Sequence, residues 1–303
     1  MRKPYQIAVL CSDLHLSLNQ PVCRVDDDWL EVQASYLGQL KDIAKGLPVI
    51  CAGDIFDRWN VQPELIHFAL RYLPDGMICV PGQHDLPDHR LDQVHRSGYG
   101  VLMEAKKIHD ISGSYAESIE FVADGFAWGQ EIKPPKLFRL PNRIQLAVIH
   151  QYCWTQGKSY PGAPSDNHCS AFKKQLKEYD AAVFGDNHMG FLTQIGDCNV
   201  INTGGFIRRK SDEIDCRPQV GILMSDGVIK PHLLDTHIDH FHEKVTEREE
   251  LPINMKEFID GLENLGEHGL NFKEAVENHL RTADLDERTK QIILGSLDHE
   301  RIN

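Results

Sequence analysis

The chain has 303 residues, of which 41% are hydrophobic and 25% are charged, an ordinary composition for a globular protein. Its net charge of −13 repels phosphate backbones, which argues against a protein that coats DNA non-specifically. An enzyme that meets nucleic acid at a metal-lined cleft remains compatible, because bound cations reverse the local field. The apolar run 7–10 is too short for a signal peptide, and no window reaches the roughly 18 apolar residues of a membrane span. The eight cysteines are scattered along the chain. We therefore expect a cytoplasmic protein with no membrane association and no disulfide framework.

Strand-like and helix-like segments alternate along the first third of the chain. Apolar runs and helical spacing predict strands at 6–12, 47–52 and 77–80, and helices at 27–45 and 63–73. Asp26, Asp27 and Asp28 suit the first turn of the first helix, and Gly46 suits its C-terminal cap. This alternation predicts an α/β fold, with helices on the faces of a sheet.

The middle of the chain is richer in strands, and its end is helical. Strands are predicted at about 119–122, 126–128, 144–149, 181–184, 191–195, 198–202, 219–224 and 228–234, with a helix at about 170–177. The later acidic helices are predicted at about 253–265, 272–281 and 285–297. We therefore predict one domain over 1–240 and a small helical region over 241–303, which would serve as a reduced cap or as a surface for a partner or dimer.

Five polar islands stand directly after predicted strands. They are Asp13-Leu14-His15, Gly53-Asp54-Ile55-Phe56-Asp57, Gly82-Gln83-His84-Asp85, His150 and Gly185-Asp186-Asn187-His188. Because ligands gather at the carboxyl ends of strands, we expect these islands to meet at one edge. Their carboxylate, imidazole and amide groups suffice for two divalent metals. A lone Asp-x-His pair is usually a polar loop, but five islands in order after five strands are hard to explain that way.

This ordered set resembles the calcineurin-like metallophosphoesterase superfamily. The pattern of that superfamily is D-x-H, G-D-x-x-D, G-N-H-D/E, a lone H, and G-H-x-H. The first, second and fourth elements match as they stand, Gln83 replaces the usual Asn, and Asp186 replaces the first His of the last element. The resemblance covers about residues 5–235 and implies a four-layer αββα sandwich.

The resemblance also implies a role for each residue of the islands. The implied metal ligands are Asp13, His15, Asp54 and His188 for one ion, and Asp54, Gln83, His150 and Asp186 for the other. His84 would protonate the leaving oxygen, and Asp85 would orient His84 and support it electrostatically. The two metals would activate a water for in-line attack on phosphorus, so no covalent intermediate is required. Asp57 is expected to anchor its own loop instead of binding metal.

The two departures from the pattern affect the second metal. Gln83 keeps the amide oxygen but adds one methylene, so the loop or the metal must shift. Asp186 exchanges an imidazole nitrogen for a hard, charged oxygen, which favours Mn²⁺ or Mg²⁺ over softer ions. We expect Mn²⁺ first and Mg²⁺ as the alternative.

Flanking residues resemble the SbcD-type DNA-repair nucleases within this superfamily. The segments 54–58 and 82–87 look like the second and third motifs of that branch, and 202–209 looks like a degenerate form of its glycine-rich turn. The implied partners are a DNA substrate and an SbcC-type ATPase, and the helical tail also makes a homodimer plausible.

Four residues are candidates for contacts with the substrate. Tyr152 and Trp154 follow His150 and could stack bases, although they could equally pack their own loop. Arg208 and Arg209 could bind a phosphate, although salt-bridged surface arginines are the commoner case.

Three functions remain open from the sequence. The first is a Mn²⁺-dependent phosphodiesterase that cleaves DNA as an exonuclease or endonuclease. The second is a phosphatase or phosphodiesterase for a small nucleotide. The third, suggested by Gln83 and Asp186, is a non-catalytic binding subunit that holds one metal or none.

Overall fold

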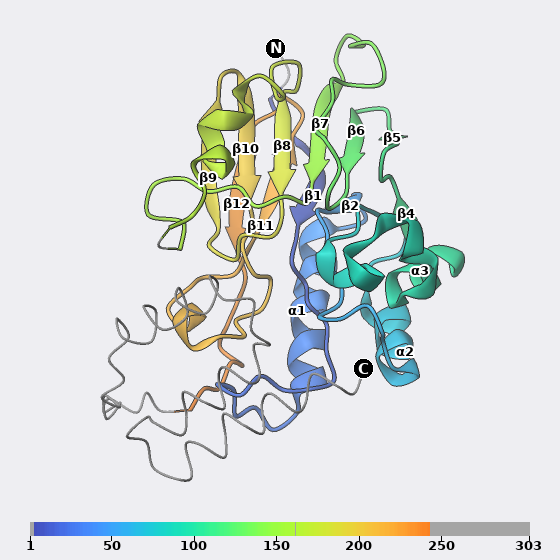
Figure 1. Cartoon of the computed structure of the whole chain (residues 1–303), viewed down its shortest axis with the longest axis vertical. Helices are drawn as coiled ribbons and strands as arrows, with labels where there is room; N and C mark the ends of the chain where they lie inside the picture. Colours follow the sequence, from blue (N-terminus) through green and yellow to red (C-terminus); the bar gives the residue numbers. More distant parts are fainter. Residues whose placement is uncertain (1–2, 161, 243–303) are drawn as a thin grey trace, which may run out of the picture. The chain divides into compact units, whose positions relative to one another are not determined.

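A computed structural model describes residues 3–160 and 162–242, and these residues form two six-stranded sheets (Figure 1). The first sheet has the order β12 (Ile229–Leu233), β11 (Gln219–Met224), β1 (Gln6–Cys11), β2 (Val49–Cys51), β3 (Met77–Cys79), β4 (Ile108–Asp110). The second has the order β5 (Tyr115–Glu117), β6 (Phe121–Phe126), β7 (Ile144–Ile149), β8 (Ala181–Phe184), β10 (Cys198–Asn202), β9 (Phe191–Ile195). The predicted α/β sandwich is confirmed.

The first sheet has antiparallel strands at one edge, and the second sheet has them at both edges. Strands β1, β2, β3 and β4 are parallel, and so are β6, β7, β8 and β10. Strands β11 and β12 extend the first sheet in antiparallel fashion, and β5 and β9 do the same for the second. The carboxyl ends of β1, β2 and β3 in one sheet and of β7 and β8 in the other therefore bring their following loops to one region.

The alternation of side chains along β1 shows how the layers pack. Val9 and Cys11 belong to the core beneath the helices, whereas Ala8 and Leu10 belong to the core between the sheets. Three α-helices in the described part of the chain cover the first sheet: α1 (Trp29–Ala44), α2 (Pro63–Tyr72) and α3 (Gly98–Glu104). Strand β1 is thus buried on both faces, which explains its uninterrupted apolar sequence.

Helix α1 begins and ends at residues with recognisable capping roles. Asp28 is the N-cap, and its carboxylate accepts a hydrogen bond from the Glu31 backbone 3.0 Å away. At the other end, the C-cap is Lys45, one residue before the predicted Gly46. Lys45 adopts the left-handed conformation with φ 49°. Gly46 follows with φ 83° and completes the turn.

The outer face of the second sheet differs from the sequence prediction. The expected helix at 170–177 is a short 3-10 helix, Cys169–Lys173, whose Phe172 packs with Leu176 on the sheet. No α-helix in residues 3–160 or 162–242 covers this face, so the outer layer here consists of 3-10 turns and loops. The other 3-10 helices are Gln83–Asp85, Pro87–His89, Leu91–Arg96, Ser165–Asn167 and Ser211–Glu213.

Two further segments also differ from the prediction. The strands expected at 119–122 and 126–128 form one strand, β6, which continues through Gly125. A side chain at Gly125 would overlap the Ile111 backbone, so only glycine allows this approach. Helix α3 and strand β4 were not predicted, because their short segments carry no distinct period.

The predicted helical region over 241–303 lies, apart from residues 241 and 242, outside the described residues and stays a prediction. The described residues belong to one compact unit, Met1–His242. Among the helices of these residues, none combines the length and apolar character needed to cross a membrane.

Candidate metal centre

The polar islands come together where the strands end. The loop after β1 pairs with the loop after β2, since the Asp13 amide donates to Gly53 and the His15 amide donates to Asp54, both at 2.9 Å. The loop after β8 joins them through the Asp186 amide, which donates to Asp13 Oδ1 at 3.0 Å. Residues far apart in the sequence are therefore held by the backbone itself.

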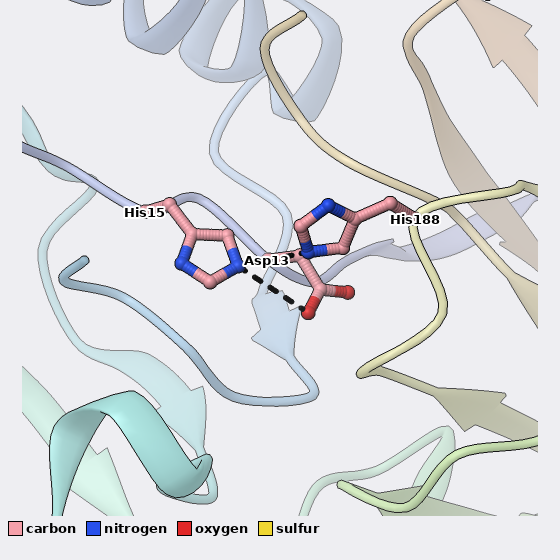
Figure 2. A group of neighbouring side chains, drawn as sticks. All are labelled: Asp13, His15 and His188. Atoms are coloured by element: carbon pink, nitrogen blue, oxygen red, sulfur yellow. Dashed lines mark hydrogen bonds and ion pairs between the residues drawn. The ribbon is translucent and has the colours of Figure 1, made fainter. Parts of the chain in front are cut away.

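The first ligand group consists of Asp13, His15 and His188. Figure 2 shows the Asp13 carboxylate and the two imidazole rings directed toward one another. The Nε2 atoms of His15 and His188 lie 3.0 Å apart, and Asp13 Oδ1 lies 3.9 Å from His15 Nε2. Asp13 and His15 are almost fully buried. The three side chains thus offer converging donor atoms, and His188 is the one that is partly exposed.

Asp54 lies between this group and the next one. Its Oδ2 atom is 3.6 Å from His15 Nε2 and 3.5 Å from His150 Nε2. Two more groups in the described residues could hold an ion: Asp13, Asp54 and His150, called the second group below, and His15, Asp54 and His84. One carboxylate in contact with both groups is the arrangement that a bridging ligand needs.

His150 is oriented by the backbone of the neighbouring sheet. Its Nδ1–H donates to the carbonyl of Ala52 at 2.5 Å, which directs Nε2 toward Asp54 and toward Gln83 Oε1, 2.7 Å away. The Gln83 amide donates in turn to Asp186 Oδ1 at 2.6 Å. Both unusual residues are therefore at the second group, where Gln83 connects Asp186 to His150.

Glu213 is a residue of the site that the sequence reading missed. His188 Nδ1 donates to Glu213 Oε1 at 3.0 Å, and Glu213 Oε2 accepts from the amides of Arg209 and Lys210. A carboxylate behind an imidazole fixes its tautomer and raises its basicity as a ligand. The sequence offers no signal for this role, because Glu213 lies in a polar loop far from the islands.

Asp85 and His84 have separate hydrogen-bond partners in the structure, so the implied support of His84 by Asp85 stays a prediction. The Asp85 carboxylate is fully buried and accepts hydrogen bonds from the backbone of Ile55, Phe56 and Gly82. His84 is held instead by the Asp57 carbonyl, which accepts from its Nδ1 at 2.7 Å. The reason is geometric: in the 3-10 turn 83–85, adjacent side chains point in different directions.

Asp57 anchors its loop, as expected. Besides its bond to His84, its carboxylate forms an ion pair with Arg209 at 2.5 Å. Arg208 is also engaged, since it pairs with Asp239 and donates to the Ile214 carbonyl at 2.6 Å. Both arginines thus have internal partners, and their phosphate contacts stay a prediction.

Four residues of the site have an uncommon backbone conformation. Asp13, His15, Asp54 and Asp186 have φ values of 53°, 46°, 54° and 77°. Left-handed conformations cost about 1–3 kcal/mol each for such residues and tend to occur at functional sites. Glycines make room for the side chains: a Cβ at Gly53 or Gly185 would overlap the ring of His150.

Burial and charge perturb the ionisation of these groups strongly. Burial raises the pKa of Asp13 to about 6. Burial opposes the charged form of His150, but the nearby carboxylates, Asp54 foremost, raise its pKa to about 10. Burial lowers the pKa of His15 well below its usual range. These opposing shifts mark a compact set of coupled acids and bases, which is typical of functional sites.

The residues present fit a divalent cation. Asp13 Oδ2 and His15 Nδ1 are buried without a hydrogen-bond partner within residues 3–160 and 162–242. A buried carboxylate oxygen without a partner is costly, and a cation would compensate it. The donor set of carboxylate oxygens and imidazole nitrogens suits Mn²⁺, Mg²⁺ and related ions.

A cavity of about 540 Å³ adjoins this centre and contains Tyr152 in its wall. Trp128 lines it too, with its ring 6.5 Å from that of His150, although the sequence had not indicated Trp128. Trp154 instead packs its loop, because its indole donates to Pro164 and its ring contacts His168. The aromatic residues after His150 therefore divide between a cavity and loop packing.

Known proteins were compared with this chain. No curated protein sequence matches it significantly. Similar solved structures include TT1561 of Thermus thermophilus, with 10% identity over 75% of this chain and 98% of that chain and a TM-score of 0.46. An archaeal phosphodiesterase has 14% identity over 75% and 99% with a TM-score of 0.39. A putative 5′-nucleotidase of Staphylococcus aureus has 13% identity over 85% and 58% with a TM-score of 0.43.

The chain also matches a protein-family model. The model described as calcineurin-like phosphoesterase matches residues 8–190, which include every ligand of the candidate metal centre. Members of this family are metal-dependent phosphoester hydrolases. Since the match spans more than half of the 303 residues, the chain belongs to the calcineurin-like phosphoesterase family.

Proposed function

We propose that this protein is a two-metal phosphodiesterase that cleaves DNA, as an SbcD-type exonuclease or endonuclease. The observation that carries the proposal is the convergence of candidate ligands, four of them buried, with Asp54 within 3.6 Å of His15 Nε2 and 3.5 Å of His150 Nε2. Asp13, His15, Asp54 and His188 would hold one ion. Gln83, His150 and Asp186 would hold the second together with Asp54. Bound cations supply Lewis acidity and neutralise the charge of the phosphate oxygens.

His84 is the proposed proton donor to the leaving oxygen. Its Nδ1–H is occupied by the Asp57 carbonyl, so Nε2 is the atom that remains for the substrate. Its ring stands edge-on to that of His15 at 4.9 Å, which places it beside the first ligand group. Its backbone amide donates to Asp54 Oδ1 at 3.0 Å, so the loop that carries the acid is tied to the bridging ligand.

The choice of DNA rests on sequence features that flank the site. The segments 54–58, 82–87 and 202–209 resemble those of SbcD-type nucleases, and this resemblance also motivates an SbcC-type ATPase partner. A homodimer through the region 241–303 is a further proposal. Oxygen donors at Gln83 and Asp186 favour Mn²⁺ as the natural ion.

A small nucleotide ester is the second candidate substrate. The cavity of about 540 Å³ beside His150 is large enough for one nucleoside, and the net charge of −13 does not favour a long polyanion. These two observations motivate a small-nucleotide phosphodiesterase or phosphatase as the alternative to the nuclease.

Activity assays with added Mn²⁺ would test both candidates. We expect the wild-type protein to cleave single- or double-stranded DNA, and His84→Ala to lower kcat by about 10²–10⁴-fold while metal content stays at two ions. His109→Ala is the matched control, since His109 is exposed on β4. Turnover of nucleotide esters without DNA cleavage would select the second candidate. A protein that binds less than one ion and cleaves neither substrate is a binding subunit, which contradicts both.

A further inference from the structure

The cavity beside His150 differs in chemistry from the metal centre that it adjoins. Trp128 and Tyr152 supply aromatic surface, and Phe172 supplies an apolar wall. Gln151, Asn167 and Gln175 supply amide groups, and Glu131 and Asp166 are its charged residues. The lining contains no lysine or arginine, so it does not suit a phosphate.

The amide groups in this lining are available for a ligand. Within the part of the chain that the structure describes, the side chains of Gln151, Asn167 and Gln175 form no hydrogen bond, in contrast to Gln130, which accepts from the Ala127 backbone at 2.9 Å. An amide offers a donor and an acceptor side by side. That pair of groups matches the edge of a heterocyclic base, which also presents donors and acceptors.

The aromatic residues connect the cavity to the reacting phosphate. Trp128 lines the cavity, and its ring centroid lies 6.5 Å from that of His150. Gln151 and Tyr152, which also line the cavity, follow His150 directly in the chain. A phosphoester held beside His150 would therefore have these aromatic residues close to its organic group. Indole and phenol rings are the surfaces on which flat bases stack.

From these observations we infer that the cavity is a nucleobase-binding subsite, which makes the substrate a nucleoside phosphodiester. The inference rests on the proposed phosphodiesterase activity and deepens it. The base would stack on Trp128 or Tyr152, and the amides of Gln151, Asn167 and Gln175 would recognise its polar edge. The acidic residues Glu131 and Asp166 disfavour a second phosphate inside the cavity.

Two chromogenic esters with the same leaving group separate the inference from the proposed function. Methyl p-nitrophenyl phosphate has no base, whereas thymidine 5′-(p-nitrophenyl phosphate) has one. With Mn²⁺ present, we expect turnover of both and a kcat/KM about tenfold or more higher for the thymidine ester. Turnover of neither ester contradicts the phosphodiesterase itself. Turnover of both with equal kcat/KM overturns the base subsite and leaves the phosphodiesterase standing.

Variants of the cavity residues test whether the preference for the thymidine ester arises in the cavity. We expect Trp128→Ala and Gln175→Ala each to lower the ratio of the two kcat/KM values, mainly through a higher KM for the thymidine ester. Gln175 is exposed, so its variant folds even if Trp128→Ala does not. Gln194→Ala on β9 is the matched control, because Gln194 is exposed and outside the cavity. An unchanged ratio in Gln175→Ala overturns the assignment, whether or not Trp128→Ala folds.

A third substrate distinguishes a base that belongs to a DNA strand from a base that belongs to a free nucleotide ester. A short single-stranded oligodeoxynucleotide that is cut with a higher kcat/KM than the thymidine ester supports a base presented by a strand. An uncut oligodeoxynucleotide supports a base presented by a free nucleotide ester. In both cases the preference for the thymidine ester over the methyl ester must hold, and its loss would contradict the inference.

Discussion

His188 and Glu213 form a hydrogen-bonded pair in which Nδ1 of the imidazole donates to the carboxylate 3.0 Å away. This contact leaves Nε2 of His188 facing His15. Glu213 is itself held by two backbone amides, so the pair is rigid. The position of one predicted metal ligand thus depends on a residue that carries no metal-binding signature.

Glu213→Gln is expected to weaken metal binding without unfolding the protein. The amide keeps the shape of the side chain but removes the charge that makes His188 a better ligand, and such changes typically cost about 10–100-fold in metal affinity. Titration calorimetry with Mn²⁺ would measure the change. Exposed Glu178→Gln is the matched control, and equal Kd values for both variants would show that Glu213 has no effect on the metal.

Asp85 and His84 are adjacent but should fail in different assays. Asp85→Ala leaves three buried backbone amides without an acceptor, so we expect it to lower the free energy of unfolding by about 3 kcal/mol or more. His84→Ala should instead lower kcat and leave stability nearly unchanged. Urea unfolding of both variants would test this, with exposed Asp92→Ala as a control that should leave stability nearly unchanged. A stable Asp85→Ala protein would refute the structural role.

Gly185→Ala is expected to disturb the second ligand group. A Cβ at this position would overlap the Ala52 carbonyl and lie 2.7 Å from His150 Nδ1, which are the two partners of one hydrogen bond. We expect a loss of about 1–3 kcal/mol in stability and weaker metal binding. Gly38→Ala is the control, because nothing lies within 4 Å of its Cβ, and alanine within helix α1 should stabilise by about 0.5–1 kcal/mol. Thermal unfolding with and without Mn²⁺ measures both.

Metal affinity should rise with pH. Burial lowers the pKa of His150, but Asp54 and the other carboxylates raise it to about 10, and Glu213 raises the pKa of His188 against the effect of burial. In the metal-free protein these rings therefore hold protons that a cation must displace. Because the raised pKa values keep the rings protonated at lower pH, the Kd for Mn²⁺ should fall about tenfold per pH unit for each displaced proton, between about pH 6 and pH 8. Calorimetry in buffers of different ionisation enthalpy would also detect the released protons, and a pH-independent Kd with no proton release would contradict this account.

The order of the islands, the apolar strands before them and the ligand types were all readable from the sequence, because each is a local pattern. Strands such as β7, β8, β9 and β10 were predicted with the bounds that the structure has, since a continuous apolar run followed by a polar turn leaves little choice. The local sequence pattern did not predict α3, and it predicted a longer helix where the 3-10 helix Cys169–Lys173 lies. In both segments, packing on neighbouring strands decides the conformation.

Only the tertiary structure decided which groups support the ligands. Glu213 lies 25 residues from His188 in the sequence, and the Ala52 carbonyl lies 98 residues from His150, so no local pattern could connect them. The partners of Asp85 could not be predicted for the same reason, because two of its three amide donors, Ile55 and Phe56, come from another loop. The sequence alone determined which residues could bind metal. Long-range hydrogen bonds, which form only when the two sheets pack, determined the direction in which each of those residues points.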